Sequence, residues 1–367
     1  MAARLSINPE DSPVAYALAE TKGNTITIQA QFRRLDPRLR AVEIRAVDPI
    51  VPSGNSGCLG WLWRLIFAIL RLLFGNVLGE VKARRVVFPA SGLTSLETFQ
   101  LRRVRLWRAG VGVRATTWRW QYRRRRKHPW TDFATSEHRI YSVLETPKAP
   151  WQQTPHAASN TQLPWTEVLD YACRWAVLTK HRDDAAARVT REVYNLGPGT
   201  VVYDCPGGGS TRYALGQFNC TAFLERLRGG IGNGVYVNCT DYATFLSTFA
   251  NILGCDLWQS RMGWGFDLNS ILAIGSSTWQ TACGWGGFSY HEVAWKGACN
   301  ANEEVYDACL LVDGDADPTA APHTPLLPVN LRFGNPGDGV YRDRLATPAG
   351  RPACAPQPTT RQRRTMN

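Results

Sequence analysis

One cysteine of the chain lies where a helix is expected to begin. Residues 234–254 place apolar side chains three and four positions apart, which predicts a helix that stops at Gly254. Asn238 can cap its first turn, and Asp241 can return a hydrogen bond to the cap. Cys239 would then open the helix, where unpaired backbone N–H groups favour a thiolate. Cys239 is therefore a candidate nucleophile; the alternative is a small buried apolar side chain.

A histidine and an aspartate follow on two predicted strands. The residues around His291 and Asp307 have strand-like patterns, and the seven residues 297–303 can turn the chain back on itself. If His291 lies directly opposite Asp307, then Val293 faces Val305, and an imidazole N–H can reach the carboxylate. The alternative is a solvent-facing histidine on an edge strand.

Together these three residues predict covalent catalysis. The thiolate of Cys239 would attack a carbonyl carbon, and the imidazole of His291 would act as base and acid. The carboxylate of Asp307 would fix the tautomer of the imidazole.

Two metal-binding alternatives start from other residues. Asp313, Asp315 and Asp317 alternate as in a calcium loop, but Pro318 and Thr324 occupy the positions of the required glycine and glutamate. The second alternative is a zinc site, which would need ligands from distant positions. No Cys-x-x-Cys spacing occurs among Cys205, Cys220, Cys255, Cys283, Cys299 and Cys309. We expect no metal site and no cofactor.

The order of these motifs resembles the transglutaminase-like branch of the papain-like cysteine enzymes. The motifs are Tyr-Val-Asn-Cys at 236–239, His-Glu-Val-Ala-Trp at 291–295 and Tyr-Asp-Ala at 306–308, and the resemblance covers about residues 235–318. It implies an α+β fold with a papain-like catalytic core. Asn238 stands where the family has a glutamine, and the backbone N–H of Cys239 is an alternative donor to the oxyanion.

The resemblance implies acyl transfer from a glutamine carboxamide or a peptide bond. His291 would protonate the departing ammonia or amine, and an acceptor amine or water would resolve the thioester. Crosslinking, deamidation and proteolysis all remain open. Residues 201–317 carry 5 basic and 12 acidic side chains, which slightly favours an amine-bearing second substrate alongside the protein substrate.

The positive charge of the chain is concentrated in its first part. Residues 1–150 carry 25 basic and 11 acidic side chains, and the excess peaks at 118–130, where arginines alternate with aromatic residues. An acidic protein or an anionic membrane is the expected partner, because no nucleic-acid-binding motif accompanies the basic run. This charge supports an alternative function: a catalytically degenerate papain-like protein that binds an anionic surface or membrane.

The sequence predicts four parts. Residues 1–150 form a β-rich basic accessory domain with strands at 24–32, 42–47, 111–120 and 138–146, and with an apolar helix at 57–79. A linker at 151–164 precedes the catalytic domain, 165–345, which begins with helices at 164–178 and 183–194. Residues 346–367, rich in proline and arginine, are expected to form a disordered basic tail.

The apolar segment 57–79 and the N-terminus bear on location. Arg64 and Arg71 interrupt the segment, so it does not reach the ~20 apolar residues that span a bilayer. We expect a buried or partner-docking helix, and the alternative is an interfacial membrane helix. The N-terminus has no secretory signal pattern, so the default location is cytoplasmic; export as a bacterial effector by signal-independent secretion is the alternative.

The 10 cysteines are too sparse for a disulfide scaffold, which leaves core, metal-binding or nucleophilic roles.

Overall fold

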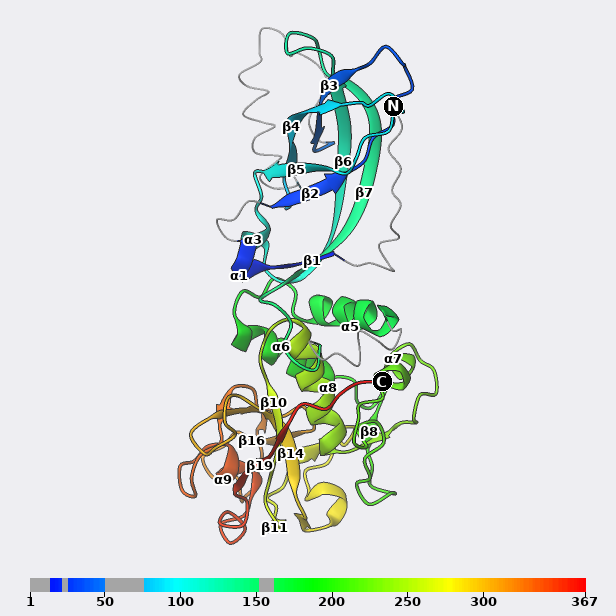
Figure 1. Ribbon diagram of the computed structural model, residues 1–367. Helices are drawn as coiled ribbons and strands as arrows, with labels where there is room; N and C mark the ends of the chain where they lie inside the picture. The colour runs from blue at the N-terminus through cyan, green and yellow to red at the C-terminus, as the bar shows by residue number, and fades with distance from the viewer. Residues whose placement is uncertain (1–13, 22–25, 50–75, 152–161) are drawn as a thin grey trace. The chain divides into compact units, whose positions relative to one another are not determined.

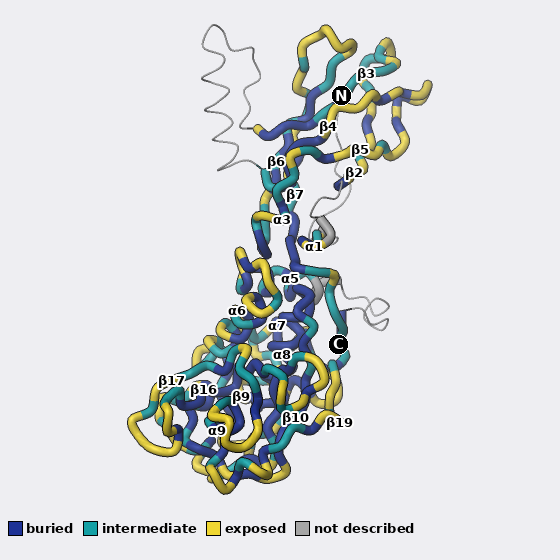
Figure 2. The backbone as a smooth tube through the Cα atoms, turned by 90° about the vertical axis from the view of Figure 1, so that its left-hand side faces the viewer, coloured by how far each residue is buried: buried dark blue, intermediate teal, exposed yellow. Residues whose placement is uncertain are grey.

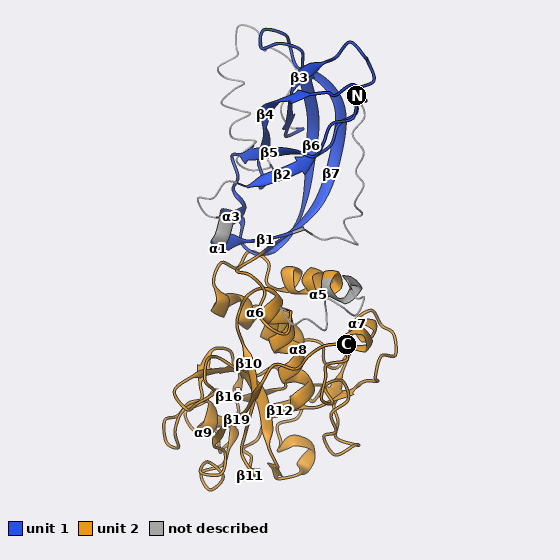
Figure 3. Cartoon of the chain, in the orientation of Figure 1, with its two compact units in different colours: residues 1–142 blue, residues 143–367 orange. Residues whose placement is uncertain are grey.

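A computed structural model describes residues 14–21, 26–49, 76–151 and 162–367 of the chain (Figure 1). It contains two compact units, Met1–Ser142 and Val143–Asn367, which Figure 3 shows in different colours. The sequence placed this division later, at residue 150. Helices and strands are both present, in keeping with the predicted α+β class.

A seven-stranded sheet forms the first unit. Its strands are β1 (Val14–Ala17), β2 (Thr27–Ala30), β3 (Ala41–Val47), β4 (Glu80–Val87), β5 (Glu97–Arg102), β6 (Gly112–Arg123) and β7 (Thr131–Val143). They lie in the order β1-β7-β6-β3-β4-β5-β2, and two short helices, α1 (Leu18–Thr21) and α3 (Leu106–Ala109), accompany them. All four predicted strands of this region are confirmed, with shifted ends.

The aromatic residues of the basic run are divided between the core and the surface. Trp118 and Trp120 are buried, and Trp120 contacts the ring of Phe32 edge to face at 5.5 Å. Trp130 instead has the guanidinium groups of Arg45 and Arg123 over its ring, at 4.0 and 4.4 Å. The alternation of tryptophan and arginine over 118–120 is therefore the in-and-out pattern of one strand.

Most of the predicted apolar helix at 57–79 lies outside the described residues. Residues 76–79 are described, and they lead by a turn into β4. Among the described residues, no helix is both long and apolar enough to cross a bilayer.

Helix α8 (Cys239–Ile252) forms the centre of the second unit, and every one of its residues is buried (Figure 2). The other helices of this unit are α5 (Gln162–Trp175), α6 (Arg182–Tyr194), α7 (Cys220–Leu227) and α9 (Tyr341–Leu345). α5 and α6 pack against α8, and the rings of Trp175 and Phe249 stack at 4.9 Å. The two helices predicted at 164–178 and 183–194 are confirmed as α5 and α6.

A five-stranded sheet packs beside α8 in the order β18-β15-β14-β10-β19. Its strands are β10 (Trp258–Met262), β14 (His291–Trp295), β15 (Glu304–Tyr306), β18 (Leu331–Arg332) and β19 (Pro356–Gln362). Smaller sheets pair β8 (Val202–Tyr203) with β9 (Tyr236–Val237), β11 (Phe266–Asp267) with β13 (Gly287–Phe288), and β12 (Leu272–Ala273) with β16 (Leu310–Asp313) and β17 (Pro325–Leu326).

The expectation of a disordered tail at 346–367 is wrong. Strand β19 pairs antiparallel with β10, with Gln259 opposite Gln362 and Met262 opposite Pro356. Beyond it, the N–H of Phe218 donates to the carbonyl of Thr365. Composition suggested disorder because the segment has few apolar side chains, but backbone pairing with a distant strand holds it in place.

Candidate active site

The predicted cap of the central helix is confirmed. The Asn238 side chain accepts a hydrogen bond from the N–H of Asp241, and the Asp241 carboxylate accepts one from the N–H of Asn238. Cys239 is the first helical residue, and Gly254, which follows the end of α8, has a φ of +92°. The capping box thus places the thiol at the positive end of the helix dipole.

The carboxylate of Asp241 is held by the loop that precedes α8. It accepts backbone hydrogen bonds from Arg212, Tyr213 and Ala214 at 3.0, 2.8 and 2.9 Å. Burial raises the pKa of Asp241 to about 6, although these hydrogen bonds act in the opposite direction. Asp241 is therefore a structural acid that fastens this loop to the start of α8.

The amide of Asn238 has a structural role as well. Its Nδ2 atom donates to the carbonyl of Gly209 at 2.8 Å and to the hydroxyl of Thr211 at 2.9 Å. Both amide protons are used, so the side chain has none left for an oxyanion. Of the two donors suggested by the sequence, the backbone N–H of Cys239 fits the geometry better, since N–H groups in the first turn of a helix have no intrahelical acceptor.

His291 and Asp307 meet, but in a different register from the predicted one. Trp295 lies opposite Val305 in the β14–β15 pair, so Val293, not His291, is level with Asp307. Strand β15 ends at Tyr306, and Asp307 lies just beyond it. His291 Nε2 nevertheless lies 2.9 Å from Asp307 Oδ2, because residues two apart along a strand share a face and a diagonal contact is within reach.

Two further groups fix the carboxylate of Asp307. The N–H of Cys309 donates to Oδ1 at 2.8 Å, and the hydroxyl of Tyr341 donates to Oδ2, also at 2.8 Å. Tyr341 comes from the short helix α9, 34 residues along the chain. Sequence reasoning missed it, because its neighbours give no signal that ties it to the histidine.

The imidazole of His291 is completely buried and stacks on Phe288, with ring centroids 5.2 Å apart and planes 9° from parallel. Burial alone would lower its pKa, but the charge and hydrogen bond of Asp307, together with the Cys239 side chain, raise that pKa to about 10. Nε2 is bound to Asp307, and Nδ1 makes no hydrogen bond to any described residue. The imidazolium form is therefore favoured between the carboxylate and the thiol.

Comparisons with known proteins find similarity only among solved structures, and that similarity is distant. No family model matches the chain, and no curated protein matches it. Among solved structures, the chain is similar to red sea bream transglutaminase, with 10% sequence identity and a TM-score of 0.36. The similarity covers 84% of this chain, which spans half of the length of that transglutaminase.

The raised pKa of His291 predicts a pH-dependent stability. Because the folded protein binds the imidazole proton more tightly than the unfolded chain, this contribution is complete below the ordinary pKa of 6.5 and is lost as pH rises toward about 10. Over that interval, we expect the free energy of unfolding of the wild type to fall more steeply than that of His291→Gln. Urea unfolding at several pH values measures both slopes, and parallel profiles would contradict the assignment.

A buried ion pair lies directly behind the thiol and the imidazole. Arg364 contacts both carboxylate oxygens of Glu292, at 2.5 and 3.2 Å, and both side chains are buried. The hydroxyl of Thr240 donates to the same carboxylate at 2.9 Å. Glu292 follows His291 in the chain, and Thr240 follows Cys239. The Arg364–Glu292 ion pair therefore supports the backbone next to both catalytic candidates. Sequence reasoning missed it, since it placed Arg364 in a disordered tail.

Two of the cysteines form a disulfide, which corrects the expectation that all were core, metal-binding or nucleophilic residues. The bond joins Cys205 and Cys283. Cys205 belongs to a glycine-rich loop in which the Asp204 carboxylate accepts backbone hydrogen bonds from Gly207 and Ser210. Two cysteines 78 residues apart carry no local signal of their pairing.

The first aspartate of the calcium alternative is used within the protein. Asp313 holds the ring of His323 at 2.7 Å and accepts backbone hydrogen bonds from Asp315 and Thr324. No cluster of metal-ligating side chains was found among the described residues. His323 and Asp313 form a second histidine–aspartate pair in the same unit.

Proposed function

We propose that the chain is a transglutaminase-like cysteine enzyme with a papain-like catalytic core. The observation that carries the proposal is the buried His291, which lies 2.9 Å from Asp307 and interacts with the side chain of Cys239 at the start of α8. A histidine held by a carboxylate and facing a thiol at a helix N-terminus is the arrangement that activates a cysteine nucleophile.

The geometry supports a two-step acyl transfer. The Cys239 sulfur attacks the carbonyl carbon of a glutamine carboxamide or a peptide bond, and the backbone N–H of Cys239 donates to the developing oxyanion. His291 gives a proton to the departing ammonia or amine, which leaves a thioester on the sulfur. An amine or water then attacks the thioester, loses its proton to His291, and restores the thiol.

Asp307 acts through His291. It accepts a hydrogen bond from Nε2, which orients the ring and stabilises the imidazolium formed during the reaction. Cys309 and Tyr341 hold Asp307 in place for this task. The outcome of the reaction depends on which acceptor reaches the thioester, an amine or water, and the same relay serves crosslinking, deamidation and proteolysis.

Mass spectrometry of a mixed set of glutamine-containing proteins tests the proposal. The proteins are incubated with the enzyme and an excess of a primary amine. Addition of the amine, conversion of glutamine to glutamate, and backbone cleavage give different mass changes, and we expect at least one of them. Cys239→Ala should abolish it.

The control is Cys220→Ala, which removes another buried thiol, outside the relay, and keeps Cys239. Its product pattern should match that of the wild type. Absence of every product, together with labelling of Cys239 by iodoacetamide no faster than that of the denatured chain, would refute the enzymatic function.

A further inference from the structure

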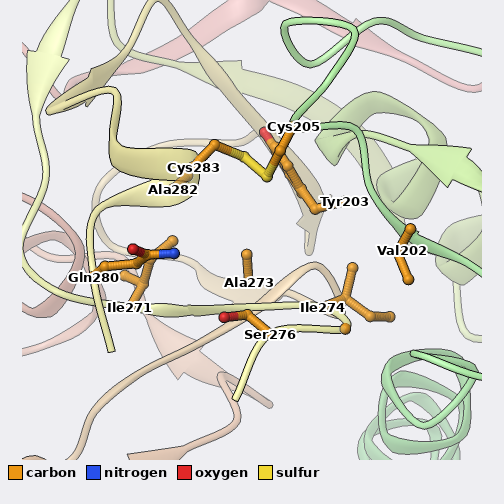
Figure 4. A pocket seen from close by; sticks show the side chains of 11 residues that line it. Val202, Tyr203, Cys205, Ile271, Ala273, Ile274, Ser276, Gln280, Ala282 and Cys283 are labelled. Carbon is orange, nitrogen blue, oxygen red and sulfur yellow. A yellow bond between two sulfur atoms is a disulfide. The ribbon is translucent and has the colours of Figure 1, made fainter. Parts of the chain in front are cut away.

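A pocket of about 230 Å³ lies in the second unit and has no role in the chemistry described so far (Figure 4). Its lining comes from β8, from the segment that contains β12, and from the two halves of the disulfide. The lining residues are Val202, Tyr203, Cys205, Ile271, Ala273, Ile274, Gly275, Ser276, Gln280, Ala282 and Cys283.

The floor of the pocket is apolar and its rim is polar. Ile271, Ala273 and Ile274 are buried, whereas Gln280 is exposed and Ser276 is half-buried. In Figure 4 the disulfide and Tyr203 lie across the hollow from Ile274 and Ser276. No lining residue is charged. Such a pocket favours an uncharged group, because an ion placed there would lose its hydration without gaining a partner.

Tyr203 connects the pocket to the nucleophile. Its N–H donates to the carbonyl of Ile274 in the pocket floor, and its strand pairs in parallel with β9, with Tyr203 level with Val237. Val237 is two residues before Cys239. The charge of Cys239 also contributes to raising the pKa of the buried Tyr203, after the larger effect of burial. Tyr203 is thus shared between the pocket wall and the surroundings of the thiol.

The surface beside the pocket offers an aromatic contact. The ring of Trp285 lies 6.1 Å from that of Tyr203, and Trp285 is 41% exposed. The disulfide fixes the two segments that form this edge, one carrying Cys205 and the other carrying Cys283. A substrate chain that contacts the exposed ring of Trp285 would therefore also lie next to Tyr203, which lines the pocket.

We propose that this pocket binds an uncharged, largely apolar side chain of the acyl-donor protein, next to the residue whose carbonyl is attacked. The proposal rests on the proposed function and adds a substrate preference to it. Leucine and methionine are the expected occupants, since they match an apolar floor, whereas glutamate and lysine are excluded by their charge.

Glutamine peptides with leucine, alanine, glutamate or lysine on either side of the glutamine test the proposal. Turnover by the wild type should favour leucine over alanine about tenfold in kcat/KM and should be lowest for the charged peptides. Ser276→Trp, which fills the rim, should remove the leucine preference mainly through a higher KM. Ser277→Trp is the matched control, since Ser277 is exposed and does not line the pocket.

Binding of the same peptides to Cys239→Ala, measured by fluorescence anisotropy, separates the pocket from the chemistry. A leucine preference in binding that Ser276→Trp removes supports the pocket, even if no product forms and the proposed function fails. Turnover without any preference among the four peptides overturns the pocket and leaves the enzyme intact. Labelling of Cys239 by iodoacetamide at the wild-type rate checks that Ser276→Trp is folded. If Ser276→Trp is not folded, the test uses Cys239→Ala without it. Equal binding of the leucine and alanine peptides to Cys239→Ala then overturns the proposal.

Discussion

Replacement of His291 by glutamine is expected to lower the rate of acyl transfer at least about 10⁴-fold. Glutamine can still hydrogen bond to Asp307, but it can neither take the proton of Cys239 nor give one to the leaving group. The measurement is kcat/KM with the best substrate found by mass spectrometry, in parallel with the rate of Cys239 alkylation. Both rates should fall in the variant.

The chain offers a matched control for this substitution. His323 also pairs with a buried aspartate in the second unit, at 2.7 Å from Asp313, so His323→Gln makes the same chemical change outside the relay. It should keep the wild-type rate. Tyr341→Phe, which removes one hydrogen bond from Asp307, should lose about tenfold. Equal losses in His291→Gln and His323→Gln would show that the effect comes from folding and would remove His291 from the mechanism.

The second large effect is expected from Arg364→Met. This substitution leaves the carboxylate of Glu292 buried without its main partner, and we expect the free energy of unfolding to fall by about 3–5 kcal/mol. The same change should slow the reaction, since Glu292 holds Thr240 beside the nucleophile. Urea unfolding followed by tryptophan fluorescence measures the first effect, and kcat measures the second.

Two further variants define the source of that loss. The double substitution Arg364→Met with Glu292→Leu removes both charges and should recover most of the stability. Arg361→Met alters an exposed arginine of the same segment and should cost no more than about 1 kcal/mol. If Arg364→Met were as stable as Arg361→Met, the buried pair would have no structural role.

Local features of the sequence predicted the start of the site well. The cap of α8 depends on Asn238, Asp241 and the apolar spacing that follows, all within one segment. The meeting of His291 with Asp307 was also predicted, because seven residues between two strand patterns leave few ways to turn. The register was wrong by two positions, since Asp307 lies beyond the end of β15 and no side-chain pattern marks that end.

The remaining parts of the site depend on contacts between distant residues. Tyr341 reaches Asp307 from a short helix, Cys205 pairs with Cys283, and Arg364 reaches Glu292 across 72 residues. None of these pairs has a recognisable spacing, because the folded sheets bring the partners together. The segment 346–367, rich in proline and arginine, was predicted to be disordered but is ordered. Composition does not reveal its backbone pairing with β10 or its one buried arginine, Arg364.

The position of Arg364 has a consequence for when the chain can become active during synthesis. Cys239, His291 and Asp307 all leave the ribosome before Arg364 does, and until then Glu292 lacks the arginine that contacts both of its carboxylate oxygens. A nascent chain that already carries the three reactive residues therefore cannot complete the support behind them. Under the proposed function, acyl transfer begins only after this late segment has paired with β10, and a newly made molecule would be held back from reacting with its neighbours while it is still being translated.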